Sequence, residues 1–312
     1  MQNLIQRLAI PVLCLATILS AAAEPKTVRL LTVGNSFSHN ATHYLGDIAK
    51  ANGDILILRE DNIGGSSFDI HLKKIEVFEK DPASKLGKYT MNRSLKDDLT
   101  LEKWDFITIQ QSSIKSHDIA TYRPFAKQLA DYIRKHAPDA TLLMHQTWEY
   151  RMDDPRFSQK VPKPGEPRTQ DEMYQGLANA YATITREIGV NLIPVGDAFH
   201  LANLDPKWGY RAPATPFDPK KAKPGELPDQ TQSLHVGWNW RTSSSGKTLL
   251  GVDGHHANMA GEYLGACVWY EVLFGRSVEG NGFVPTGLDA EYAKFLQTTA
   301  HHAASTGSRT VR

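Results

Sequence analysis

The chain has 312 residues, of which 41% are apolar, enough for one large domain or two small ones with a substantial buried core. The first 23 residues have the pattern of a secretory signal peptide, with Arg7 before the apolar stretch 8–19 and three alanines at 21–23. This stretch is too short to span a bilayer comfortably. We therefore expect it to be cleaved, leaving a secreted or periplasmic protein with no stable membrane insertion.

The rest of the chain is formally neutral, because loss of Arg7 reduces the 35 Lys and Arg residues to 34, against 34 Asp and Glu. Nucleic acids and anionic membranes favour a basic surface, so neither is expected as a partner. Only Cys267 would remain after cleavage, which excludes an intramolecular disulfide. We expect it to be a small buried residue in a helix rather than a catalytic thiol.

Short apolar runs alternate with segments of helical period. The runs predict five strands, at 28–33, 55–58, 106–109, 141–144 and 191–195. Helices are expected around 45–49, 125–133 and 173–188, with a last one over 257–274. Nearly continuous apolar strands separated by amphipathic helices are typical of a parallel sheet covered on both faces, so the predicted class is α/β.

Three insertions interrupt this pattern, at about 61–100, 150–168 and 201–250. Each follows the carboxyl end of a predicted strand, where open α/β sheets place their ligand sites. The last insertion has little period and is expected to be a long functional loop without regular structure. The simplest organisation is a signal peptide over 1–23, one domain over 24–303 and a flexible tail over 304–312.

Two polar motifs near opposite ends of the chain could carry chemistry. The first predicted strand stops on Gly34-Asn35-Ser36, and Asp253-Gly-His-His256 precedes the last helix. A nucleophilic serine needs a base within hydrogen-bond reach, and the base needs a third group to orient it. Each motif alone is also explained by helix capping or by the helix dipole. Together they predict catalysis by Ser36, His256 and Asp253.

In the order and spacing of these motifs, the chain resembles the SGNH (GDSL-type) hydrolase superfamily. The stretches that carry the resemblance are GNSFS at 34–38, IGGSSF at 63–68 with His71, Trp104-Asp105 leading into Gln110, Gln146-Thr147-Trp148, and 253–267. The resemblance implies a flavodoxin-like three-layer α/β/α fold with a five-stranded parallel sheet and long rim loops. It also implies that Ser36 is the nucleophile, that His256 is the base, and that Asp253 orients His256.

The same resemblance implies an oxyanion hole formed by the backbone N–H groups of Ser36 and Gly65. The chain departs from the family at the third donor, because no Gly-x-Asn-Asp block follows the third predicted strand. The segment Gln110-Gln111-Ser112-Ser113 stands there instead. The side-chain amide of Gln110 or Gln111 could replace the missing Asn, or the two glutamines only tie the loop together.

Several residues near the expected rim are candidates for substrate binding. His71 and Trp148 are assigned to it by position, and the aromatic residues of the last insertion either stack on sugar rings or fold inward. These aromatic residues are Trp208, Tyr210, Trp238 and Trp240. A metal site could form if Asp253, His255, His256 and His235 converge, but the sequence contains neither an H-E-x-x-H nor a CxxC motif. No metal and no cofactor are expected.

The leading functional hypothesis is a secreted serine esterase that acts on a small-molecule or glycan ester, with an O-acetyl group on a carbohydrate as the suggested substrate. The alternative is a catalytically inactive carbohydrate-binding module on the same fold. Asn35, which stands where the family commonly has Asp, and the missing Asn block favour that alternative. A phosphate-binding domain is disfavoured because the segment 34–40 contains a single glycine.

Overall fold

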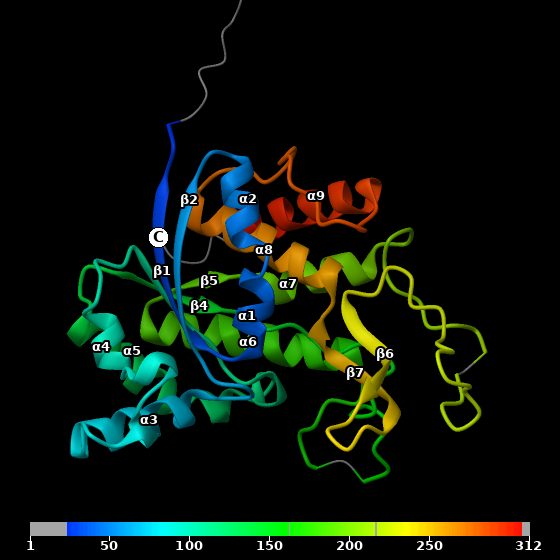
Figure 1. Cartoon of the computed structure of the whole chain (residues 1–312), viewed down its shortest axis with the longest axis horizontal. Helices are drawn as coiled ribbons and strands as arrows, with labels where there is room; N and C mark the ends of the chain where they lie inside the picture. The colour runs from blue at the N-terminus through cyan, green and yellow to red at the C-terminus, as the bar shows by residue number, and fades with distance from the viewer. Residues whose placement is uncertain (1–23, 162, 216, 308–312) are drawn as a thin grey trace, which may run out of the picture.

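The computed structural model describes residues 24–161, 163–215 and 217–307 (Figure 1). The expected signal peptide, 1–23, lies outside these residues. Five strands form one sheet in the order β2-β1-β3-β4-β5, and all neighbouring strands are parallel. The strands are β1 (Thr27–Gly34), β2 (Ile55–Asn62), β3 (Phe106–Ile109), β4 (Thr141–His145) and β5 (Asn191–Ile193). The predicted parallel sheet and the three-layer α/β/α class are confirmed.

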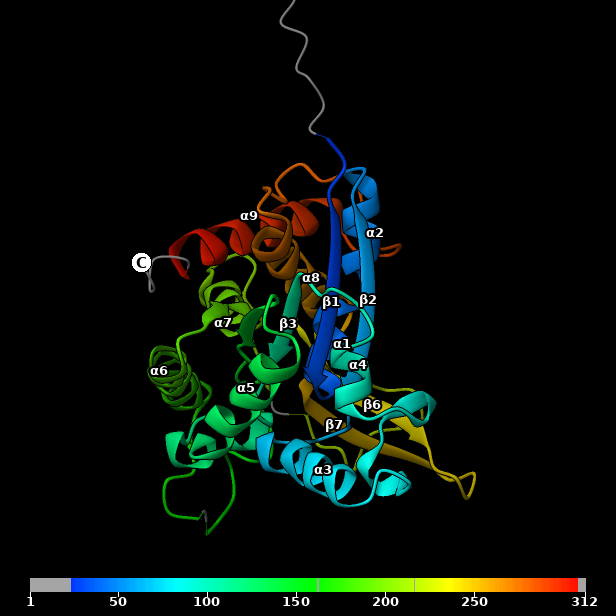
Figure 2. The ribbon, with the colours of Figure 1, turned by 90° about the vertical axis from the view of Figure 1, so that its left-hand side faces the viewer.

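Helices cover both faces of this sheet (Figure 2). One layer contains α1 (Ser36–Thr42), α2 (Leu45–Ala51), α7 (Val195–Leu204), α8 (Met259–Phe274) and α9 (Ala290–Gly307). The other contains α3 (Phe68–Lys80), α4 (Leu95–Leu99), α5 (Phe125–His136) and α6 (Gln170–Ile188). Short 3-10 helices lie at Lys85–Gly87, Thr90–Asn92, Ser113–Lys115 and Ile119–Tyr122. Within the described ranges, no helix combines the length and apolar character that a bilayer span requires.

Strand β1 lies between β2 and β3, and the chain leaves its carboxyl end at the point where the strand order reverses. In open α/β sheets, ligands bind in the crevice outside the carboxyl ends of the strands at this point. The segment that begins at Gly34 therefore enters the position that the topology favours for a site. Beneath it, the side chains of Leu30, Leu31 and Val33 are fully buried in the core.

The third insertion differs from the prediction. Its second half forms an antiparallel hairpin of β6 (His235–Thr242) and β7 (Thr248–Ala257), and in the described part of the chain these two strands pair only with each other (Figure 1). Helix α7 also enters the insertion, up to Leu204. The expectation of a structureless loop over 201–250 is therefore wrong for these parts. Strand β6 lacks the strong apolar alternation that indicates a strand, because it contains Gly237 and several half-exposed polar and aromatic residues.

The C-terminal region contains a helix that the periodicity did not indicate. Helix α9 packs on α7 and α8 and continues through Gly307, so residues 304–307 are helical rather than part of a tail. Cys267 is buried in α8, as expected. Burial raises the pKa of its thiol and keeps it protonated.

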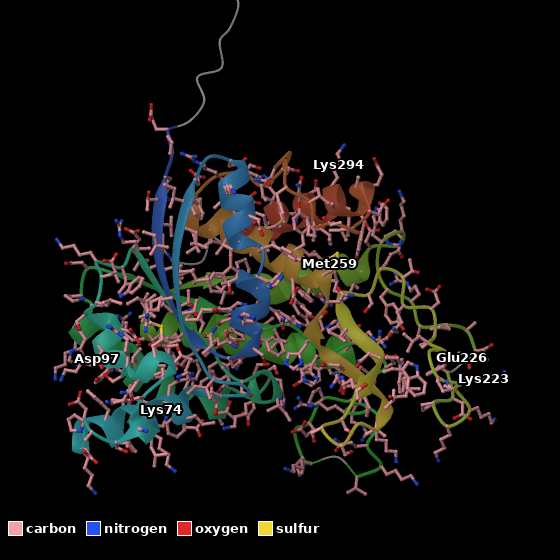
Figure 3. All side chains as sticks on the ribbon, in the orientation of Figure 1. Lys74, Asp97, Lys223, Glu226, Met259 and Lys294 are labelled. Atoms are coloured by element: carbon pink, nitrogen blue, oxygen red, sulfur yellow. The ribbon has the colours of Figure 1, made fainter. Side chains whose placement is uncertain are left out.

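Charged side chains of both signs project from elements around the molecule, among them Lys223 and Glu226 before β6 and Lys294 on α9 (Figure 3).

One carboxylate lies in the interior instead of on the surface. Asp61, near the end of β2, is fully buried, and neither of its carboxylate oxygens has a hydrogen-bond partner among the described residues. The nearby Asp98 is paired with Arg59 at 2.5 Å and with Arg93 at 2.6 Å. Burial, followed by repulsion from Asp98, raises the pKa of Asp61 from 3.8 to about 8.

This raised pKa predicts a pH-dependent loss of stability. Because the folded state holds the proton more tightly than the unfolded state, stability falls as pH rises from about 4 to about 8. Asp61→Asn removes the ionised group, and should raise the free energy of unfolding at pH 9 by about 1–3 kcal/mol. Urea unfolding at pH 5 and pH 9 measures this, with little change expected at pH 5. Asp69→Asn, at a half-exposed carboxylate paired with Lys115, serves as control and should give no gain at pH 9. An equal effect of Asp61→Asn at both pH values would contradict the prediction.

Candidate active site

The turn after β1 is closed by hydrogen bonds from a single side chain. Asn35 Oδ1 caps α1 by accepting from the Phe37 N–H at 2.9 Å, and it also accepts from Gln110 Nε2 at 2.7 Å. Asn35 Nδ2 donates to the Ser66 carbonyl at 2.8 Å. Asn35 thus links α1, the segment after β3 and the segment after β2. Ser36, the first residue of α1, is held at the centre of these three segments.

Gly34 is needed because the segments approach one another closely. A Cβ atom at this position would lie 2.5 Å from Ser38 Oγ and 2.8 Å from Gln110 Oε1. Real Cβ atoms do not approach that closely, so a larger residue would push Gln110 away from Asn35. The glycine therefore permits the packing that holds Ser36.

The second motif lies on the hairpin, at the end of β7. Gly254 in the middle of this motif has no room for a side chain, because a Cβ would lie 2.5 Å from Asp154 Oδ2. The Arg151 N–H donates to the Gly254 carbonyl at 2.7 Å, and Trp148 Nε1 donates to the His255 carbonyl at 2.9 Å. The segment after β4 therefore fixes the backbone of Asp253–His256 from one side.

The predicted serine, histidine and aspartate meet in a continuous chain of hydrogen bonds. Ser36 Oγ lies 2.9 Å from His256 Nε2, and His256 Nδ1 lies 3.0 Å from Asp253 Oδ2. The His256 backbone N–H also donates to Asp253 Oδ1, at 3.0 Å. This second bond fixes the plane of the carboxylate relative to the imidazole.

Asp253 is held in its ionised form. Burial alone would raise the pKa of its carboxyl, but hydrogen bonds from the His256 ring and backbone N–H, together with the charges of the neighbouring histidines, hold that pKa well below its usual range. Arg241 on β6 adds a further donor, with Nη2 at 2.8 Å from Asp253 Oδ2. The sequence does not predict this contact of Arg241, because no local pattern indicates that β6 pairs with β7.

A small cavity of about 230 Å³ opens in front of Ser36. It is lined by Asn35, Ser36, Phe37, Gly65, Ser112, Ser113, Ile114, Tyr150, His255 and His256. Gly65 faces it with φ of +68°, a conformation that favours glycine, and a Cβ there would meet nothing within 4 Å. Its backbone N–H has no hydrogen-bond acceptor among the described residues. A larger cavity of about 750 Å³ lies along β5 and α6 and shares no lining residue with this one.

His71 does not line the cavity, contrary to its assignment as a substrate-binding residue. It is fully buried, with Nε2 at 2.9 Å from Ser66 Oγ and Nδ1 at 2.8 Å from Tyr89 Oη. Burial lowers the pKa of His71 to about 4 and keeps it neutral. Ser66 Oγ also donates to the Gly34 carbonyl. His71 therefore supports the turn that contains Gly65.

Trp148, predicted to bind substrate, is also fully buried and does not line the cavity. Its ring lies 4.3 Å from the Phe37 ring and stacks on Phe199 at 4.4 Å. Through its hydrogen bond to the His255 carbonyl, Trp148 supports the hairpin end instead. Two of the four aromatic residues of the insertion fold inward, because Trp208 stacks on Tyr292 and Tyr210 is buried.

Neither Gln110 nor Gln111 lines the cavity, so the structure does not bring the predicted third oxyanion donor into place. The Gln110 side chain is buried among Ser38, Asn35 and His145. Gln111 ties the loop, because its Nε2 donates to the Thr121 carbonyl and its Oε1 accepts from the Ser112 N–H. The two serines that follow reach the cavity instead. The Ser112 hydroxyl has no hydrogen-bond partner among the described residues, whereas Ser113 Oγ lies 3.0 Å from Tyr150 Oη.

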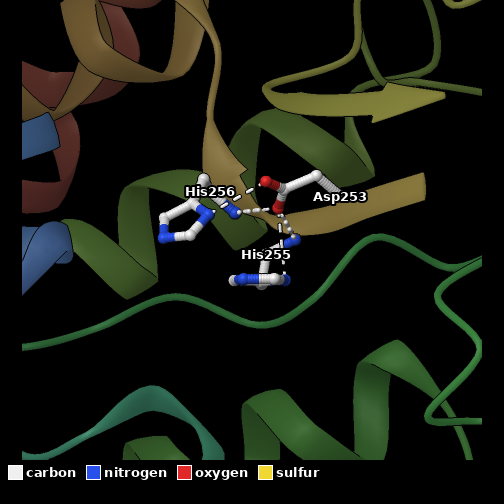
Figure 4. Close-up of side chains that lie close together, drawn as sticks. All are labelled: Asp253, His255 and His256. Carbon is white, nitrogen blue, oxygen red and sulfur yellow. Dashed lines mark hydrogen bonds and ion pairs between the residues drawn. The ribbon is translucent and has the colours of Figure 1, made fainter. Parts of the chain in front are cut away.

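Three of the four candidate metal ligands from the sequence lie close together. Asp253, His255 and His256 each offer a donor atom within 4.8 Å of the others (Figure 4). The fourth, His235, is buried and points to the Glu149 carbonyl at 2.9 Å. The cluster is thus a carboxylate flanked by two imidazoles.

The fold and these contacts define an α/β/α protein with a serine, a histidine and an aspartate in hydrogen-bonding order at the carboxyl end of its sheet. Residues 29–205 match the model of DUF4886, a domain of unknown function, and the chain belongs to this family. A crystal structure of a DUF4886 family protein from Bacteroides uniformis is similar to it at 27% identity, with a TM-score of 0.66, over 92% of this chain and 97% of that one.

Two further solved structures are similar at lower identity. A protein from Slackia heliotrinireducens, provisionally described as an SGNH hydrolase, is 19% identical with a TM-score of 0.46, over 78% of this chain and 98% of that one. A provisionally assigned GDSL-like lipase from Parabacteroides merdae is 13% identical with a TM-score of 0.42, over 82% and 99%. No curated protein sequence matches the chain.

The contacts of Asn35 predict a large effect of its removal. Asn35→Ala eliminates the helix cap and leaves the Gln110 amide and the Ser66 carbonyl without partners, so the free energy of unfolding should fall by about 2–4 kcal/mol. Asn35→Asp retains the two accepting interactions and should lose less. Asn40→Ala is the control on the same helix, with one hydrogen bond to Glu262, and should cost about 1 kcal/mol or less. Guanidinium unfolding curves measure all three. Equal losses for Asn35→Ala and Asn40→Ala would show that Asn35 does not join the three segments.

Proposed function

We propose that this protein is a serine hydrolase that cleaves esters through an acyl-enzyme. The observation that carries the proposal is the unbroken chain from Ser36 Oγ through His256 to Asp253, with distances of 2.9 and 3.0 Å. Helix capping requires neither of these contacts. The proposal covers the activity, and also the secreted or periplasmic location that residues 1–23 suggest.

The hydrogen bonds assign the roles of the imidazole nitrogens. An ionised carboxylate only accepts, so His256 Nδ1 carries the proton that faces Asp253. His256 Nε2 is then free to accept the proton of Ser36 as Oγ attacks the ester carbonyl. The imidazolium returns this proton to the leaving alcohol, and Asp253 stabilises its charge meanwhile. Water, activated by the same histidine, then releases the acid from Ser36.

The oxyanion of the tetrahedral intermediate needs donors on the cavity side of Ser36. The backbone N–H groups of Ser36 and Gly65 are the first two, and Gly65 lines the cavity. The Ser112 hydroxyl is the third in this proposal, replacing the glutamines that the sequence suggested. Loss of one such donor typically slows turnover by about 10²–10³-fold.

The size of the cavity favours a small acyl group. At about 230 Å³ it is smaller than the roughly 300–1,000 Å³ of pockets for drug-sized ligands. Ile114 and Tyr150 close its sides. Trp238 and Trp240 on β6 remain partly exposed and could stack on a sugar ring. We therefore propose an O-acetyl group on a carbohydrate as the substrate class.

Fluorophosphonate labelling tests the activated serine. The protein without residues 1–23 should form one adduct, on Ser36, and both Ser36→Ala and His256→Ala should abolish it. Asp253→Asn should slow labelling and ester turnover by about 10²–10⁴-fold, because the imidazole loses its orienting anion. Ser38→Ala, at the other serine of the same turn, should still be labelled. Intact-protein mass spectrometry measures the adduct. Absence of an adduct on folded wild-type protein would reject the proposal and favour a carbohydrate-binding module, to be sought on glycan arrays.

Acyl-chain selectivity tests the size of the cavity. The kcat/KM for p-nitrophenyl acetate should exceed that for the octanoate ester by at least about 10-fold, since a longer chain does not fit. Ile114→Ala should shrink this ratio by opening the wall, whereas Leu86→Ala, at an exposed apolar side chain outside the cavity, should not. Acetate release from acetylated xylan tests the carbohydrate. Preference for long-chain lipid esters would overturn the substrate class while leaving the serine chemistry intact.

A further inference from the structure

The carboxylate of Asp253 is shared by two histidine rings. His256 Nδ1 lies 3.0 Å from Oδ2, and His255 Nδ1 lies 3.2 Å from Oδ1. The two rings are 4.2 Å apart between centroids, at 46° (Figure 4). The proposed serine chemistry uses one of these imidazoles and leaves the other unassigned.

These donors have the type and spacing of a zinc site. Zinc binds imidazole nitrogen and carboxylate oxygen at about 2.0–2.2 Å, in a tetrahedron whose ligand atoms are therefore about 3.3–3.5 Å apart. The distances from His256 Nδ1 to Oδ2, 3.0 Å, and from His255 Nδ1 to Oδ1, 3.2 Å, are close to this value, and one donor atom from each of the three residues lies within 4.8 Å of the others, so small side-chain rotations would bring them around one ion. The His255 and His256 side chains are 37% and 33% exposed, so an ion can reach them from solvent. Water from the cavity would supply the fourth ligand.

We propose that Asp253, His255 and His256 bind a zinc ion that switches off Ser36, an effect that rests on the proposed serine hydrolase function. Zinc on His256 Nδ1 takes the lone pair of that nitrogen, so the ring proton moves through solvent to Nε2. The Nε2–H then donates to Ser36 Oγ and cannot accept its proton. The His256 imidazole stays neutral with one proton throughout, while the bonds to zinc replace its hydrogen bond to Asp253 and the contact of Arg241 with Asp253 is released.

Arg241 opposes the ion. Its Nη2 donates a hydrogen bond to Asp253 Oδ2, and its positive charge repels a cation. The Arg241 side chain is 56% exposed and can therefore turn away into solvent when zinc binds. Zinc affinity then reflects a balance between His255, which supplies a ligand, and Arg241, which competes with the ion. Substitutions at these two positions should shift affinity in opposite directions.

Isothermal titration calorimetry with ZnCl₂ in a non-chelating buffer tests the site without any substrate. Wild-type protein should bind one zinc ion with a Kd in the micromolar range. His255→Gln should weaken binding by at least about 10-fold, and Arg241→Gln should tighten it by about 3-fold or more. His302→Gln, at an exposed histidine on α9, should leave the titration unchanged and controls for adventitious binding.

Fluorophosphonate labelling in the same buffer tests the switch. Zinc should suppress labelling of wild-type protein by at least about 10-fold, with full recovery after EDTA, and the concentration that halves labelling should follow the calorimetric Kd across the variants. Equal zinc affinity in His255→Gln and wild type would overturn the site. Zinc bound at this site with undiminished labelling would overturn the switch. Absence of labelling even in EDTA would reject the proposed function, and the titration would still decide whether zinc binds.

Discussion

The contact between Ser36 Oγ and His256 Nε2 joins two residues that are 220 positions apart, and much of the structure serves to hold it. On one side, the apolar strand β1 fixes the start of α1, and Asn35 locks that start to the segments after β2 and β3. On the other, Arg151 and Trp148 hold the backbone of the β7 end. The contact between Ser36 and His256 therefore requires both halves of this support.

The parts of the fold that could be predicted from the sequence are those where burial decides the residue type. The central strands are buried on both faces and are therefore mostly apolar, which distinguishes them clearly in the sequence. Helix α6 carries its buried residues at helical spacing and ends at Gly189, in the left-handed conformation. The hairpin has no such signal, because it covers only the rim and most of its residues are partly or fully exposed.

The residues of the candidate site also differ in how far the sequence predicts their positions. Ser36, Asp253 and His256 could be predicted because their chemistry requires those residue types in a fixed order. His71, Trp148 and Gln110 were assigned by proximity in sequence, which does not determine side-chain direction. All three face inward, where they support the turns that present Gly65, His255 and Ser36. Arg241 reaches Asp253 only through pairing of β6 with β7, which no local pattern indicates.

Ser36 and His256, the proposed nucleophile and base, belong to parts of the molecule with different mechanical support. Ser36 follows a strand of the central sheet, whereas Asp253 and His256 lie on a two-stranded ribbon that pairs with no other strand among the described residues. Isolated ribbons of this kind are only marginally stable, and local opening costs less free energy than global unfolding. Much of the ribbon's attachment runs through Arg151, whose Nη1 donates to Gln230, which in turn bonds the backbone of Trp238 on β6. Detachment of the ribbon would separate His256 from Ser36 while the sheet stayed folded, so the proposed activity would be lost before the protein denatures.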